Sequence, residues 1–141
     1  MRVIFSRKGF DSSAGGFPNP IFPDGTLYMV PIPDESSNVF YSDLTFKYED
    51  DSIRKILNDL TGRRIRIKGK MKFCDYNERY FKCHLDPMEI NTSGFKGIAF
   101  GQTNSSVCHL LKHGVGKDDV FLFFSWFREV EKRGERWRYK P

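Results

Sequence analysis

The sequence predicts one α+β domain over residues 1–141, with a mixed β-sheet or partly open barrel and two or three short helices. Three observations predict this fold: an apolar stripe with helical periodicity, segments in which apolar and polar side chains alternate, and glycines and prolines between them. A chain of 141 residues fits a single domain. It is also long enough to bury a core without disulfide bonds.

Two strands are predicted near the start of the chain. The first covers residues 2–5, which are mostly β-branched or aromatic. A polar, glycine-containing loop follows over residues 6–16, and the prolines of residues 18–23 keep the chain extended. The turn signal Asp24-Gly25 introduces the second strand, over residues 26–32, which ends among prolines.

A helix is predicted after the polar, irregular stretch of residues 36–51. Ser52 is a suitable N-cap, because its hydroxyl can accept from a free backbone N–H of the first turn. The apolar residues behind it recur at i, i+3, i+4 and i+7 and are Ile53, Ile56, Leu57 and Leu60. Gly62 stands where a C′ glycine ends a helix.

The next segment, residues 64–73, alternates apolar residues or glycine with five cations, which are Arg64, Arg66, Lys68, Lys70 and Lys72. Strand side chains alternate between faces, so a single strand here would be apolar on one face and basic on the other. Cations about 7 Å apart can meet successive phosphates of a nucleic-acid backbone, which gives salt-sensitive binding without sequence preference. The alternative is a solvated face whose lysines protect a sheet edge.

Three more elements complete the predicted fold. Residues 80–84 pair with the basic strand as a hairpin, with the turn at residues 75–78. A further helix starts at Asn104 or Ser105 and ends at Gly114. Residues 120–127 form an apolar and aromatic strand that is expected to be buried on both faces.

Composition adds expectations about partners and compartment. The net charge of +5 favours phosphate-bearing partners, and residues 63–72 and 128–140 hold six Lys or Arg each, together 12 of the 23. The three cysteines form no CxxC pair, which predicts free thiols in a reducing compartment rather than disulfides or a zinc site. The sequence shows no signal-peptide pattern and no apolar run of roughly 20 residues, so a cytoplasmic protein is expected. No metal is expected, and the sequence identifies no cofactor.

The loop after the first strand is a candidate anion-binding site. Its glycines let the backbone approach a ligand, and its backbone N–H groups can form a concave anion site. The side chains expected to bind a ligand here are Ser6, Arg7, Lys8, Ser12 and Ser13. From the spacing alone, a surface turn fits equally well, because the loop matches no established phosphate-binding motif.

His84 and Asp86 are the first candidates for chemistry elsewhere in the chain. Two residues apart on an extended chain, they share a face and can serve as an acid/base pair or as metal ligands. The alternative is that both simply hydrogen-bond to loop backbone.

Other candidates lie in the last third of the chain. Gln102 and Asn104 precede His109 at the start of the predicted helix, where an anion or a base edge can bind. Ordinary helix capping explains the same residues. Trp126, near the end of the aromatic strand, is a candidate for stacking on a base, although core packing explains most of the neighbouring rings.

Five blocks of the sequence, in order, resemble the nucleotide modification associated domain 3 family: residues 6–13, 31–34, 84–87, 101–102 and 120–128. The resemblance covers nearly the whole chain. It implies a component of bacterial or phage DNA-modification or defence systems, with other proteins of such a system as possible partners.

Two departures from the family pattern limit what the resemblance implies. Met88 stands where the family usually has a second acid after Asp-Pro, and family members tend to continue beyond the position of Pro141. A binding-only or partner-dependent version of the family is therefore one implication. The aromatic strand of residues 120–127 also resembles one element of PUA-like base-binding barrels, although a shared element does not fix function.

Three functions remain open from the sequence. The first is a module that holds nucleic acid along the basic strand and a base or nucleotide in a pocket at the N-terminal loop. The second is an enzyme that modifies or hydrolyses a nucleotide or base, with phosphate held by Arg7 and Lys8. In it, the base or electrostatic stabiliser would be Asp11 or Asp86, and the acid would be His84 or His109. The third is a phage inhibitor whose basic faces bind an acidic host protein.

Overall fold

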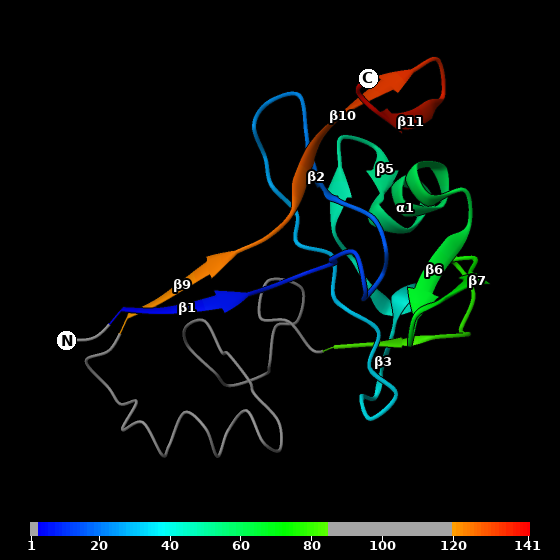
Figure 1. The fold of residues 1–141 in the computed structure, drawn as a ribbon. Coiled ribbons are helices and arrows are strands. Elements are labelled where there is room, and N and C mark those ends of the chain that lie inside the picture. Colours follow the sequence, from blue (N-terminus) through cyan, green and yellow to red (C-terminus); the bar gives the residue numbers. More distant parts are fainter. Residues whose placement is uncertain (1–2, 85–119) are drawn as a thin grey trace, which may run out of the picture.

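The computed structural model describes residues 3–84 and 120–141 (Figure 1). The helices of this part are α1 (Ile53–Thr61) and the short 3-10 helix η1 (Tyr41–Asp43). The strands are β1 (Val3–Arg7), β2 (Asn19–Ile21), β3 (Val39–Phe40), β4 (Lys47–Tyr48), β5 (Asp51–Ser52), β6 (Arg64–Ile67), β7 (Lys70–Phe73), β8 (Lys82–Cys83), β9 (Val120–Phe124), β10 (Phe127–Arg133) and β11 (Arg136–Tyr139).

The predicted α+β class is wrong. Strands make up 39 % of the described residues and helices 12 %, so this part of the chain is β-rich with one α-helix. The further helix predicted from Asn104 or Ser105 lies outside the described residues. In residues 3–84 and 120–141, five small sheets stand in place of the predicted mixed sheet or barrel. Prolines explain part of this fragmentation, because each one removes a ladder donor and restricts the residue before it.

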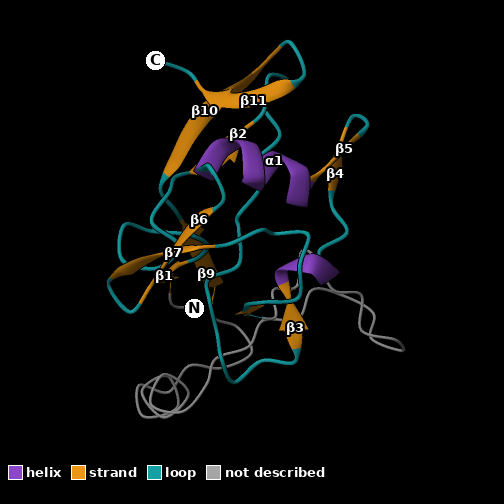
Figure 2. Cartoon of the chain, turned by 90° about the vertical axis from the view of Figure 1, so that its right-hand side faces the viewer, coloured by secondary structure: helices purple, strands orange, loops and turns teal. Residues whose placement is uncertain are grey.

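The sheets connect the two ends of the described chain. β1 runs parallel to β9, and the chain continues from β9 into β10, which pairs in parallel with β2 and antiparallel with β11. The other pairs, all antiparallel, are β3–β8, β4–β5 and β6–β7. In Figure 2, α1 lies between the β10–β11 hairpin and β6, and it contacts both β11 and β6.

Helix α1 forms as its sequence predicts. The Ser52 hydroxyl accepts a hydrogen bond from the backbone N–H of Lys55 at 3.2 Å, and Gly62 ends the helix with a φ of 64°. The predicted apolar face is buried, with Ile53 and Ile56 fully inaccessible to solvent.

The strand predicted over residues 26–32 does not form. Leu27 makes one isolated bridge to Ile21, and the backbone N–H of Val30 donates to the side chain of Asn19 instead of to a neighbouring strand. The backbone N–H of Tyr28 donates to the carbonyl of Pro20, and the carbonyl of Ile32 accepts from His84, so separate tertiary hydrogen bonds replace a strand ladder.

Aromatic rings supply six of the 17 buried core side chains in the described residues. Trp137 packs edge-on against Phe22 and Tyr48, with ring centroids 5.5 and 5.6 Å apart. Phe10 and Tyr41 pack in the same core, also edge-on, at 6.3 Å. Most of the described rings therefore stabilise the fold and are not available to a ligand.

Residues 120–127 differ from the predicted doubly buried strand. The strand breaks between β9 and β10, and the described side chains at this break, Phe124 and Trp126, are 45 % and 46 % exposed. Among the described strands, β9 pairs only with β1.

Cys74 and Cys83 are buried and are not joined to each other by a disulfide, and Cys108 lies outside the described residues. Burial raises the pKa of the Cys74 thiol to about 12, so this thiol stays protonated at neutral pH. In the described part of the chain, no helix has the length and apolar character needed to cross a bilayer.

Candidate functional site

The basic segment is a hairpin and not the single strand that alternation predicts. β6 and β7 pair antiparallel, with Ile67 opposite Lys70 and Arg64 opposite Phe73. Lys68 and Gly69 form the two-residue turn, with φ values of 51° and 77°. Positive φ at both central residues is characteristic of a type I′ hairpin turn, and glycine tolerates this conformation best.

The hairpin divides the cations between two faces. Residues that pair directly across antiparallel strands point to the same side, so Arg64 and Arg66 share a face with Phe73 and Met71. Lys70 and Lys72 lie on the opposite face, next to Ile67 and Ile65, and Lys68 lies in the turn. The prediction of five cations on one face is therefore wrong.

These cations nevertheless keep their charge available. In the described part of the chain no carboxylate lies within ion-pair distance of Arg64, Arg66, Lys70 or Lys72, and Lys68 contacts only the exposed Glu35, at 3.5 Å. The basic stretch at residues 128–140 is different. It supplies three cations that pair with acids, in the pairs Lys132–Asp51, Arg138–Glu131 and Lys140–Glu129.

Asp11 organises the N-terminal loop. Its Oδ1 accepts from the Ser13 hydroxyl at 2.8 Å and from the backbone N–H groups of Ser13 and Ala14 at 2.9 and 2.6 Å. Partial burial would raise the pKa of Asp11, but these hydrogen bonds hold it below its usual value. Asp11 is thus an ionised, already occupied acceptor, which suits a structural role better than the general-base role considered from the sequence.

The N-terminal loop is joined to the hairpin. Gly15 and Arg66 exchange two backbone hydrogen bonds of 2.9 Å, and the Arg66 guanidinium donates to the carbonyl of Ser12 at 3.2 Å. A Cβ at Gly15 would lie 2.3 Å from the ring of Phe10, so only glycine fits here. Two segments 50 residues apart therefore form one surface.

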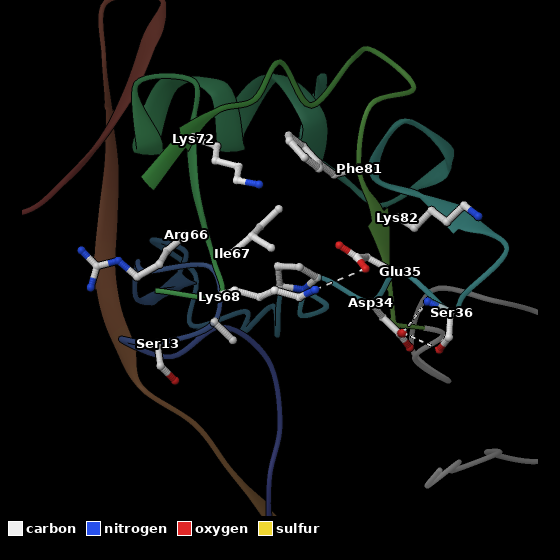
Figure 3. Close-up of a pocket in the computed structure, with 12 residues that line it drawn as sticks. Ser13, Asp34, Glu35, Ser36, Arg66, Ile67, Lys68, Lys72, Phe81 and Lys82 are labelled. Carbon is white, nitrogen blue, oxygen red and sulfur yellow. Dashed lines mark hydrogen bonds and ion pairs between the residues drawn. The ribbon is translucent and has the colours of Figure 1, made fainter. Parts of the chain in front are cut away.

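A cavity of about 390 Å³ opens between this loop, the turn after Pro33, the hairpin and β8 (Figure 3). Its lining residues are Ser13, Ala14, Pro33, Asp34, Glu35, Ser36, Arg66, Ile67, Lys68, Lys72, Phe81 and Lys82. In Figure 3, Lys72 extends toward the ring of Phe81 and Lys68 reaches toward Glu35. The Arg66 guanidinium and the Lys82 ammonium point away from the centre.

A second Asp-x-Ser turn forms the opposite wall of the cavity. Asp34 Oδ1 accepts from the hydroxyl and the backbone N–H of Ser36, at 2.6 and 3.0 Å. The other oxygen, Oδ2, lies 3.1 Å from Nδ1 of His84. Partial burial would raise the pKa of Asp34, but the bonds from Ser36 and His84 hold it below its usual value.

His84 is therefore paired with Asp34, whereas the sequence suggested Asp86. A carboxylate on Nδ1 fixes the orientation and tautomer of an imidazole and leaves Nε2 for a further partner. Asp86 lies outside the described residues, as do Gln102, Asn104 and His109. In the described part of the chain, no group of three or more His, Cys, Asp or Glu side chains has the geometry of a metal site.

The remaining predicted site residues lie away from the cavity. The Arg7 guanidinium is exposed, 5.5 Å from the ring centroid of Phe124 and 4.0 Å from Asp11 Oδ2. Trp126 is half-exposed next to β10, and its carbonyl accepts from Asn19. Ser6 belongs to β1, and Lys8 follows this strand directly and does not line the cavity.

The profile of one protein family, described as nucleotide modification associated domain 3, matches residues 2–140. The chain belongs to the nucleotide modification associated domain 3 family. No curated protein and no solved structure matches the chain significantly. Family membership associates this domain with nucleotide modification, and the description names no ligand or reaction.

Within this nucleotide modification associated domain, sequence reasoning missed Asp34, Ser36 and Phe81 as cavity residues. The Pro33-Asp34 step lies inside one of the blocks that carry the family resemblance, which was the available signal. Phe81 gave no signal, because an aromatic residue in a short strand is most often part of the core.

Proposed function

We propose that the cavity binds the phosphate-bearing part of a nucleotide, either free or within nucleic acid. The observation that carries this proposal is Lys72, whose ammonium group extends into the cavity and has no carboxylate partner in the described part of the chain. Lys68, on the turn, adds a second cation at the rim. A phosphate supplies the negative charge that Lys72 lacks, and it can compete with the exposed Glu35 for Lys68.

The apolar part of the cavity suits a base or a sugar. Ile67 is 8 % exposed at the floor, and the Phe81 ring faces it across the cavity. The hydroxyls of Ser13 and Ser36 already donate to Asp11 and Asp34. These serines therefore shape the walls, and the direct contacts to phosphate come from the lysines.

Replacing Lys72 with alanine is expected to weaken nucleotide binding about 10- to 150-fold, the effect of losing one charge-assisted hydrogen bond of about 1.5–3 kcal/mol. Isothermal titration calorimetry with nucleoside monophosphates and with inorganic phosphate measures this effect. Lys70→Ala is the matched control, because Lys70 lies on the same strand and face but does not line the cavity. Equal losses in both variants, or no affinity for any nucleotide, would contradict the proposal.

An enzyme acting on the bound nucleotide is a second candidate, favoured by the His84–Asp34 pair. With Nδ1 held by Asp34, the Nε2 atom of His84 can accept a proton from an attacking water or group. In this second candidate function, Asp11 has a structural role in the N-terminal loop and His84 is the general base.

If this second function holds, His84→Ala should lower turnover by about 10²- to 10⁴-fold and leave nucleotide affinity nearly unchanged. Product analysis by liquid chromatography over a panel of nucleotides and nucleosides measures turnover, and calorimetry measures affinity. Turnover at the native rate in His84→Ala excludes His84 as the base. If the native protein converts none of the panel, binding alone remains.

A further inference from the structure

We propose that the hairpin face turned away from the cavity binds single-stranded nucleic acid, with unpaired bases stacking on it. This arginine face consists of Arg64 and Arg66 on β6 and Met71 and Phe73 on β7. The inference goes beyond the nucleotide cavity. Arg66 also lines the cavity, although its guanidinium points away from the centre, and the other three side chains lie outside the cavity lining, so either proposal can fail alone.

The apolar members of this face do not belong to the core. Phe73 is 63 % exposed and Met71 is 38 % exposed, whereas Ile65 and Ile67 on the other face are 0 % and 8 % exposed. Every residue of β7 is exposed, and among the described strands β7 pairs only with β6. An exposed aromatic ring beside an exposed thioether gives a flat, polarisable surface suited to a planar ligand.

The two arginines are only partly satisfied within the chain. Arg64 donates through Nε to the carbonyl of Thr61 at 3.1 Å, and its guanidinium lies 5.7 Å from the Phe17 ring centroid. Arg66 donates through Nη1 to Ser12, while its buried Nε has no hydrogen-bond partner in the described structure. Both charges remain uncompensated by acids in the described residues, so an anionic partner is favoured.

The charged and the apolar side chains of the arginine face form two parallel rows. Arg64 and Arg66 are two residues apart on one strand, so they are about 7 Å apart along it, close to the repeat of an extended nucleotide chain. Met71 and Phe73 form the second row, about 5 Å away across the hairpin. Phosphates can follow the first row while bases stack on the second.

A single strand of nucleic acid offers phosphates to the arginine row and base faces to the apolar row at the same time. Its backbone supplies phosphates for bidentate guanidinium contacts, and its bases expose their faces for stacking on aromatic side chains. A duplex presents the same phosphates but keeps its base faces stacked inside. The exposed Phe73 ring therefore selects single strands over duplexes.

The test is fluorescence anisotropy with a labelled single-stranded DNA of mixed sequence, its duplex, and anionic lipid vesicles as a competitor. Phe73→Ala should weaken single-strand binding about 5- to 150-fold, and Phe73→Trp should preserve it. Tyr80→Ala is the matched control, because Tyr80 is also exposed, at 57 %, but lies outside the face. Arg64→Ala should lower the slope of log affinity against log salt by about 0.7.

The cavity variant separates the two proposals. Lys72→Ala should leave Phe73-dependent stacking intact, and Phe73→Ala should leave mononucleotide binding intact. Unchanged single-strand binding in Phe73→Ala overturns the inference, as does equal affinity for the duplex. Displacement of the DNA by vesicles at stoichiometric lipid, with tighter binding to vesicles than to DNA, also overturns it by assigning the face to a membrane surface.

Discussion

Replacing Trp137 with alanine is expected to lower the free energy of unfolding by about 3–5 kcal/mol, a large share of the roughly 5–15 kcal/mol typical of a domain. Trp137 is 1 % exposed, and its ring packs edge-on against Phe22 and Tyr48. Its Nε1–H also donates to Asp51 at 2.8 Å. The substitution therefore opens a cavity in the aromatic core and removes a hydrogen bond to a carboxylate.

Urea denaturation followed by circular dichroism measures this loss. Trp126→Ala is the matched control, because the second tryptophan is 46 % exposed and should cost less than about 1 kcal/mol. A Trp137→Ala variant that loses no more stability than the control would show that the aromatic cluster does not hold the domain together.

The elements that local sequence could predict are those fixed by local contacts. Ser52, the apolar stripe of α1 and Gly62 each act within one helix, so periodicity and capping chemistry specify them. The strand predicted over residues 26–32 does not form, because the contacts of this segment are not local. The backbone N–H of Val30 is satisfied by Asn19, eleven residues away, and no local pattern records that contact.

The basic segment shows how a correct alternating pattern can still predict the wrong set of side chains on each face. Alternation predicts faces only while the strand continues, and a two-residue turn exchanges the faces of odd and even positions. Gly69 occupied an apolar position in the alternating pattern, yet its positive φ makes it part of the Lys68-Gly69 turn. The arginines consequently join Met71 and Phe73 on one side, and Lys72 turns toward the cavity on the other.

The candidate site was predictable only in part. Charge clustering and the glycine-containing loop placed Ser13 and Lys72 among the candidates, and the cavity brings them together. Net charge could not separate the free hairpin cations from the C-terminal ones, because ion pairing depends on the fold. The contact between His84 and Asp34 spans 50 residues and is likewise set by tertiary structure.

The most consequential residue that sequence reasoning missed is Asn19, a fully buried side chain that ties three segments together. Its Oδ1 accepts from the backbone N–H groups of Phe10 and Val30, at 3.2 and 2.7 Å. Its Nδ2 donates to the carbonyls of Phe10 and Trp126, both at 3.0 Å, and to the hydroxyl of Ser125 at 2.6 Å. The N-terminal loop, which forms one wall of the cavity, is anchored at this point.

Asn19→Ala is expected to cost about 3–6 kcal/mol, because it leaves several buried backbone groups unpaired at about 1–3 kcal/mol each. Ser125→Ala, which removes only one partner of Nδ2, should cost about 1 kcal/mol.

Asn19→Asp keeps the acceptor but places a buried, unpaired carboxylate against two carbonyls, so the folded-state pKa of the new group rises above its unfolded value. Its stability relative to that of the native protein should therefore increase as pH falls from about 7 to about 5. Chemical denaturation of the three variants at both pH values measures these differences, and an Asn19→Asp variant without this pH dependence would contradict the buried hydrogen-bond geometry.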